Sequence, residues 1–108
     1  MRNFLTKAMD IIDRHMSNEE FDVSMLCEEM HMSRSTFFRK LDALTNQSPV
    51  DFIRTLRLKR AAVMLKEKYG NIIEVALKVG FSNPSYFAKM FKNTFSVSPS
   101  TFVKMQPT

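Results

Sequence analysis

Apolar residues along the chain recur at helical spacing rather than in alternation. Near the start they repeat at i, i+4, i+7 and i+8, which predicts an amphipathic helix with one face in a core. This first stripe consists of Phe4, Leu5, Ala8, Met9, Ile11, Ile12, His15 and Met16. Strict alternation over five or more residues, which is typical of a half-buried strand, does not occur in the sequence. The pattern predicts an all-α fold.

Each later helix is expected to begin after a side chain that can cap free backbone N–H groups. These caps are Asp22, Ser33, Ser48, Asn71, Asn83 and Ser98. Proline follows three of them, at the first helical position, where its missing N–H costs nothing. Together they predict seven helices, the longest running from Ser48 to about Lys68. In the helix after Ser33, we expect Phe37, Leu41 and Leu44 to face the core.

The plan from Asp22 to Ile53 returns from Asn71 to Val103. The two copies match at an offset of 49 residues as far as Phe81, and at an offset of 50 after Ser82, which is one extra turn residue. Each copy reads as helix, tight turn, helix. Two copies are too few for a solenoid. The repeat instead suggests two equivalent elements that contact one elongated, periodic partner.

The turns have residues that tolerate a left-handed backbone. Gly80 supplies this position in the second copy, and His31 stands at the same place in the first. Asn46 is expected to play a similar part after the next helix.

This organisation predicts two helix-turn-helix subdomains, residues 1–47 and 69–108, joined by a linker helix over residues 48–68, together forming one domain. Four basic residues, Arg54, Arg57, Lys59 and Arg60, interrupt the apolar surface of the linker helix. Part of that helix is therefore expected to reach solvent or a partner.

A helix of roughly twenty residues is about 30 Å long. The separation of successive major-groove faces of B-DNA is similar, roughly 34 Å.

Charge points to a polyanion as the partner. The chain of 108 residues carries a formal net charge of +5. Residues 1–30 hold three basic and seven acidic side chains, whereas residues 31–108 hold thirteen basic and four acidic ones. The basic character therefore begins near the second helix of the first copy. Phosphates that bind such a surface release condensed counterions, which favours association.

The sequence argues against an enzyme, a cofactor or a metal site. Its single cysteine, Cys27, aligns with Ala76 on an apolar stripe and is expected to be a small core residue rather than a nucleophile. The spacing of His15 and His31 fits no zinc site, and two glycines are too few for a phosphate-binding loop. The first residues are not expected to form a leader, and no apolar run is long enough to cross a bilayer. A cytoplasmic setting without membrane attachment is expected.

Several motifs together resemble the DNA-binding domain of bacterial AraC/XylS-type transcription regulators. The stretches that carry the resemblance are Arg57-Leu-Lys-Arg-Ala61, Ile73-Glu-Val-Ala76, Val79-Gly-Phe81, Ser85-Tyr-Phe87, Met90-Phe-Lys92 and Ser98-Pro99 with Phe102. The resemblance extends from Phe4 to Met105. It implies seven helices, two helix-turn-helix units and regulation of transcription. It also implies that such a domain is the carboxyl-terminal output module of a larger regulator. Its expected partner is double-stranded DNA, and RNA polymerase is a further candidate partner.

Helix phase and the alignment of the copies select candidate contacts with DNA. The residues expected to read bases are Arg34, Ser35, Phe38, Arg39, Asn83, Ser85 and Lys89. The residues expected to contact the DNA backbone are Thr36, Lys40, Tyr86 and Lys92. Arg39 is the leading candidate because a guanidinium can bind guanine O6 and N7 with two hydrogen bonds. It could also pair with phosphate or remain solvated, and Phe38 could touch thymine methyl groups or extend the core.

The alternative function is a basic helical protein–protein interaction module without sequence-specific DNA binding. The isolated domain is expected to be a monomer, because one chain could reach two adjacent grooves.

Overall fold

The computed structural model describes residues 3–107, which form seven helices and no strand. The helices are α1 (Phe4–Arg14), α2 (Val23–Met30), α3 (Arg34–Thr45), α4 (Pro49–Lys66), α5 (Ile72–Lys78), α6 (Pro84–Phe95) and α7 (Pro99–Met105). The expected all-α class is therefore confirmed. Residues 1, 2 and 108, which the expected subdomain ranges include, lie outside the described residues.

The helix ends follow the sequence signals closely. All six expected caps accept a hydrogen bond from the backbone N–H three residues on, and Asn71 and Glu74 form a capping box. His31 and Asn46 adopt the expected left-handed conformation, each with φ of 57°. Helix α4 ends at Lys66, two residues earlier than expected, and Lys68 has a left-handed φ of 56° that is incompatible with further helix.

Two hydrophobic clusters lie along the molecule. The first is built mainly from α1, α2 and α3 with the start of α4, and includes Ala8, Ile12, Leu26, Phe37, Leu41 and Phe52. The second is built from the rest of α4 with α5 and α6, and includes Leu58, Ala61, Val75, Val79, Phe87 and Phe91. Met16 packs against both clusters. One cluster lies in each expected subdomain and includes part of α4. The boundaries at residues 48 and 69 stay a prediction.

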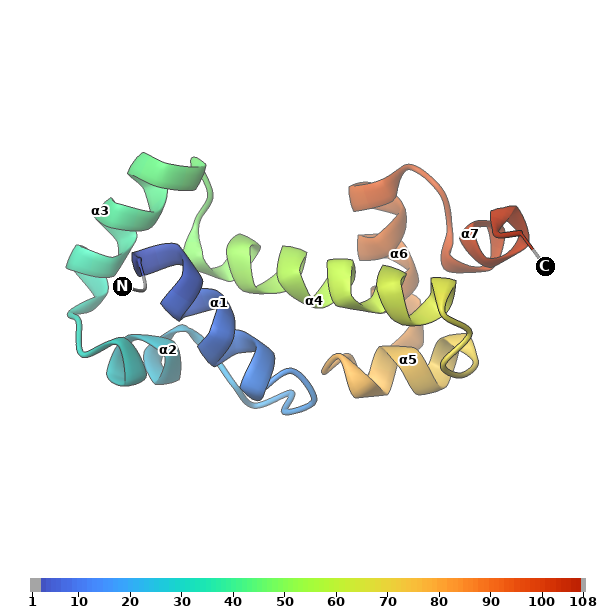
Figure 1. Ribbon diagram of the computed structural model, residues 1–108, viewed down its shortest axis with the longest axis horizontal. Helices are drawn as coiled ribbons and strands as arrows, with labels where there is room; N and C mark the ends of the chain where they lie inside the picture. Colours follow the sequence, from blue (N-terminus) through green and yellow to red (C-terminus); the bar gives the residue numbers. More distant parts are fainter. Residues whose placement is uncertain (1–2, 108) are drawn as a thin grey trace.

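Helix α4 connects the two halves of an elongated molecule, 44 × 28 × 23 Å in extent. Figure 1 shows α3 and α6 at separate places along α4, and the carboxyl-terminal end of each rises above it. Helices α2 and α5 lie below α4 in the same view. In this view, the second helices of the two repeats therefore extend in the same direction past the central helix.

Arg57, on α4, is buried, whereas Lys59 and Arg60 of the same helix are exposed, as expected for a helix of which part reaches solvent. Only 6% of the surface of Arg57 is accessible. Its Nη1 donates to the carbonyl oxygens of Met16 and Val79, both at 2.7 Å, and its Nη2 donates to that of Asn18 at 3.0 Å. Val79 caps the end of α5, and Met16 follows the end of α1. The guanidinium thus binds carbonyl groups at the negative ends of two helices.

A second hydrogen bond joins the halves beside Arg57. The backbone N–H of Ser82 donates to Oε2 of Glu19 at 3.0 Å. Gly80 provides the space for the guanidinium, since a β-carbon there would lie 1.6 Å from Nη1 of Arg57. We call Glu19, Arg57, Gly80 and Ser82 the interhalf clamp, because they tie the connection after α1 to the turn before α6.

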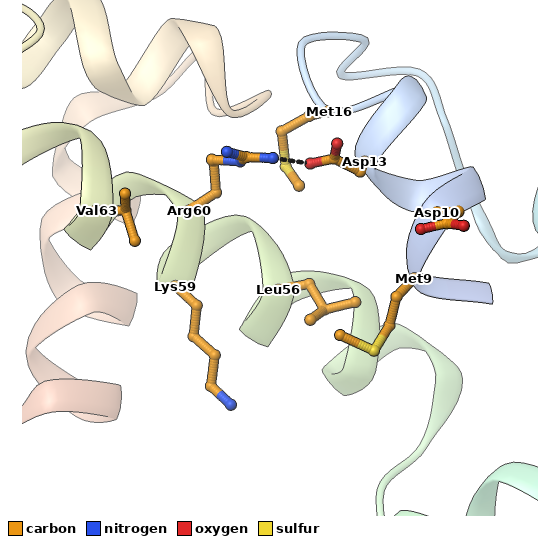
Figure 2. Close-up of a pocket in the computed structure, with 8 residues that line it drawn as sticks. All are labelled: Met9, Asp10, Asp13, Met16, Leu56, Lys59, Arg60 and Val63. Carbon is orange, nitrogen blue, oxygen red and sulfur yellow. Dashed lines mark hydrogen bonds and ion pairs between the residues drawn. The ribbon is translucent and has the colours of Figure 1, made fainter. Parts of the chain in front are cut away.

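Helices α1 and α4 also enclose a surface pocket of about 350 Å³. Figure 2 shows its lining, where Arg60 of α4 pairs with Asp13 of α1. Met9, expected on the buried stripe of α1, lines this pocket with 44% of its surface exposed. The ion pair supplies a further link between α1 and the central helix.

Candidate nucleic-acid interface

Helix α3 divides into a buried face and an exposed face. Phe37 and Leu41 are fully buried, whereas Arg34, Ser35 and Arg39 are exposed. Phe38 is 40% exposed, so its ring is accessible at the surface and not sealed in the core. The exposed face of α3 therefore contains all four base-reading candidates of the first copy.

Leu44 does not face the core as expected, because 58% of its surface is exposed. It lies in the last turn of α3, the part that rises away from the other helices in Figure 1. Periodicity identified the helix correctly but did not show where its packing ends.

The two arginines of α3 make polar contacts within the first half. Arg34 donates from Nη1 to Oγ of Ser24 at 3.0 Å. Arg39 lies back along its own helix, with Nε 3.4 Å from the carbonyl oxygen of Ser35 and Nη2 3.5 Å from Oγ1 of Thr36. These last distances are at the long limit for hydrogen bonds. The guanidinium of Arg39 can therefore leave them at small cost.

Helix α6 repeats this division. Phe87 and Phe91 are fully buried, and Ser85 and Lys89 are exposed at the positions matching Ser35 and Arg39. Asn83 is also exposed, and its Oδ1 accepts from the backbone N–H of Tyr86 at 3.0 Å as the cap of the helix. The side-chain NH2 group of Asn83 is the part suited to donate to a base.

The four candidate backbone contacts have different surroundings. Thr36 is half-buried, and its Oγ1 accepts from Ser33 Oγ at 2.9 Å. The Nζ atom of Lys40 lies 5.8 Å from the ring centroid of Phe4. Tyr86 is partly exposed beside the ring of Phe81, and Lys92 is exposed in the last turn of α6. The lysines and Tyr86 can reach an external phosphate more readily than Thr36 can.

The exposed faces of α3 and α6 carry hydroxyl, amide, guanidinium and ammonium groups, which can form hydrogen bonds with a ligand. Cys27 is buried, as its alignment with Ala76 predicted, and burial raises the pKa of its thiol. Among residues 3–107, no group of three or more His, Cys, Asp or Glu side chains is placed to hold a metal ion. In the same range, no helix has the length and apolar character needed to span a membrane.

Sequence reasoning missed the residues that join the halves. Arg57 stands between the buried residues Ile53 and Ala61, a place where an unpaired charge would be costly, and this was the available signal. The repeat identifies Ser82 as an extra turn residue, but nothing in the sequence indicates its hydrogen bond to Glu19. Hydrogen bonding from Ser82 holds the pKa of Glu19 below its ordinary value. The side chain of Ser82 makes the larger contribution and its backbone N–H the smaller one.

Comparison with known proteins agrees with this architecture. A family model described as a helix-turn-helix domain matches residues 26–105. The chain is 43% identical to part of histidine kinase P4 of Formosa agariphila, covering 91% of this chain and 7% of the kinase. It is 32% identical to the HTH-type transcriptional regulator MtrA of Neisseria gonorrhoeae, covering 87% of this chain and 31% of MtrA. The chain thus spans less than a third of either relative.

A solved structure shares the fold at similar size. The DNA-binding domain of the global transcriptional factor AdpA, solved in complex with a target DNA, superimposes with a TM-score of 0.83 at 28% identity. The match covers 95% of this chain and 92% of that domain. With the repeated helical units and the matched family model, these findings show that the chain belongs to the AraC-type helix-turn-helix family of DNA-binding transcription regulators.

Proposed function

We propose that this chain recognises a specific duplex DNA sequence by placing α3 and α6 in two successive major grooves. The observation that carries the proposal is the matched pair of helices, each with two fully buried apolar side chains on one face and exposed polar and basic ones on another. Helix α4 has 18 residues and is about 27 Å long. One turn of B-DNA is roughly 34 Å, so α4 spans most but not all of that distance.

Base reading would come from the exposed faces. In α3, Arg34, Ser35, Phe38 and Arg39 are the proposed residues, and Asn83, Ser85 and Lys89 are their counterparts in α6. A guanidinium at Arg39 can bind guanine through two hydrogen bonds, whereas the ammonium at Lys89 binds as a point charge. The two half-elements of the site are therefore expected to differ in sequence.

Positioning would come from backbone contacts. Lys40, Tyr86, Lys92 and Thr36 are proposed to contact phosphates, which fix register without reading sequence. Basic residues predominate from residue 31 onward, with thirteen basic against four acidic side chains, and this excess supports attraction to DNA.

We further propose that the domain is the output module of a larger bacterial regulator. The match to a segment making up 7% of a histidine kinase supports a place beside signalling domains. The match to 31% of MtrA supports a place in a smaller regulator as well. In either setting the domain would work in the cytoplasm, with RNA polymerase as a further partner.

Selection of bound duplexes from a random pool tests the proposal. We expect one motif with two unlike half-elements whose centres lie about 10 base pairs apart, and binding that survives excess random DNA. Light scattering should show one chain per duplex. Equal binding to every duplex would contradict sequence-specific recognition and would favour the protein-interaction alternative.

A further inference from the structure

We propose that the interhalf clamp makes the domain selective for the spacing between its two half-elements. This inference rests on the proposed function, and it assigns a positioning role to Glu19, Arg57, Gly80 and Ser82. None of these residues is among the proposed DNA contacts. Their contacts join the connection after α1 to the turn before α6, at a distance along the chain of 63 residues for Glu19 and Ser82.

The clamp is needed because the two hydrophobic clusters are largely separate. On α4, the first includes the buried Ile53 and the partly buried Leu56, and the second begins at Leu58, with Met16 packed against both. A single helix between two bodies can bend gently, as long helices commonly do. Contacts away from the helix axis resist such bending and also resist rotation of one half about α4. Arg57 and Glu19 make contacts of this kind.

The hydrogen bond from Ser82 acts at the start of the proposed second reading helix. Ser82 directly precedes Asn83, whose side chain caps α6. When its N–H is bound to Glu19, the beginning of α6 is tied to the first half of the molecule. Ser82 is also the residue by which the second repeat exceeds the first. The extra turn residue of the second copy is therefore the one that makes the cross-half contact.

Spacing selectivity follows from the geometry of DNA. One turn of B-DNA takes 10–10.5 base pairs, so each added base pair displaces a half-element by about 3.4 Å and rotates it by roughly 35°. A chain with fixed halves loses contacts at one half-element when the spacing changes. A chain with mobile halves can follow the change and keep both sets of contacts. Such a chain loses conformational freedom when it binds, including at the best spacing.

The test measures binding to the selected duplex and to versions with one base pair added or removed between the half-elements. Glu19→Ala removes the acceptor for Ser82, and Glu20→Ala is a control with the same change of charge at the neighbouring exposed position. We expect the preference for the best spacing to fall at least about threefold in Glu19→Ala and to stay within about twofold of the original in Glu20→Ala. General loss of stability would weaken binding to all three duplexes without changing their ratio.

Arg57→Met provides the stronger disruption, with circular dichroism used to confirm that the variant is folded at the assay temperature. We expect its spacing preference to fall at least as far as that of Glu19→Ala. An unchanged ratio in Glu19→Ala, together with an unchanged ratio in folded Arg57→Met, would overturn the proposal. If Arg57→Met does not fold, the ratio in Glu19→Ala decides alone.

A measurement without DNA separates this proposal from the proposed function. Spin labels on Ala43→Cys and Asn93→Cys, in a Cys27→Ala background, report the distance between exposed sites on α3 and α6. We expect a broader distance distribution when Glu19→Ala is added and no broadening with Glu20→Ala. If the unaltered domain prefers no duplex, the proposed function fails. If it does prefer one, and neither the distances nor the spacing ratio respond, only the clamp proposal fails.

Discussion

Gly80 leaves space for Arg57. A β-carbon at residue 80 would lie 1.6 Å from Nη1 of Arg57 and 3.0 Å from the carbonyl oxygen of Met16. Gly80 also has a φ of 90°, in the region that side chains disfavour. Glycine is therefore required here for two independent reasons, one within the turn and one across the molecule. His31, at the matching position of the first repeat, has the left-handed backbone that its turn requires, but no cross-molecule contact among the described residues requires a glycine there.

This difference gives opposite expectations for the two turn residues. Gly80→Ala should lower the free energy of unfolding by about 3 kcal/mol or more, because the new methyl group displaces the guanidinium and the backbone remains strained. His31→Gly should be neutral or stabilising by up to about 1 kcal/mol, because the exposed histidine has a φ of 57° that glycine adopts freely. Urea unfolding followed by circular dichroism measures both. Equal losses in the two variants would contradict the second role assigned to Gly80.

Two arginines on α4 carry the same charge but differ in burial, so their substitutions compare a buried guanidinium with an exposed one. Arg57→Met should cost about 3 kcal/mol, since it removes hydrogen bonds to three carbonyl groups beside a buried site. Arg60→Met removes an ion pair with Asp13 in which both side chains are about half exposed, 45% and 51%, and it should cost less than about 1 kcal/mol. Thermal or urea unfolding can compare them. Similar losses would show that the carbonyl contacts of Arg57 contribute little beyond a surface ion pair.

Local features of the fold could be predicted because they depend on neighbouring residues. A cap at Asn71, a left-handed residue at Asn46 and a proline after Ser48 each follow from hydrogen bonding or backbone geometry within a few positions. Packing between distant segments has no such local signal. Leu44 was assigned to the core from its period, yet the last turn of α3 rises beyond the neighbouring helices (Figure 1). No local pattern predicts that Arg57 is buried, because the helix ends that surround it lie far away in the sequence.

The same distinction applies to the candidate interface. Helical phase predicted that Ser35, Arg39, Ser85 and Lys89 share exposed positions, and all four are exposed in the structure. It could not predict that Arg39 lies along its own helix, because a flexible side chain chooses among several nearby acceptors. Whether these residues contact DNA stays a prediction.

Glu19 should make stability depend on pH in a definite direction. Hydrogen bonding from Ser82 places the pKa of Glu19 in the folded chain below its ordinary value. The ionised carboxylate therefore stabilises the fold above the ordinary pKa, and this contribution is lost as the pH falls through the lowered value. The difference in stability between the original domain and Glu19→Ala should be present at pH 7 and should shrink on acidification from about pH 5 to about pH 3.

Urea unfolding at several pH values gives this difference directly, because the other carboxylates contribute equally to both proteins. Glu20→Ala serves as the comparison, because it removes the same charge at the neighbouring exposed position. A gap between the original domain and Glu19→Ala that widened on acidification would have the wrong sign for the hydrogen bond to Ser82.

Arg39→Ala should weaken binding to the selected duplex by about 1–3 kcal/mol, with most of the loss at one base pair. In the free chain Arg39 makes only long hydrogen bonds, at 3.4 and 3.5 Å, so little must be broken before it reaches a base. Binding to duplexes with each base pair changed in turn provides the measurement. A loss that is equal on every duplex would assign Arg39 to phosphate instead.

Lys40, the next residue of α3, is expected to contact phosphate rather than a base, so Lys40→Ala should have a different effect from Arg39→Ala. A lysine that binds phosphate neutralises one charge on DNA and releases counterions, whatever the sequence. Its removal should therefore weaken all duplexes alike and reduce the slope of log affinity against log salt by about 1. In the free chain Nζ lies 5.8 Å from the ring centroid of Phe4, so a competing intramolecular contact exists. An unchanged salt slope would mean that Lys40 keeps this contact in the complex, and that the phosphate must be held by other residues.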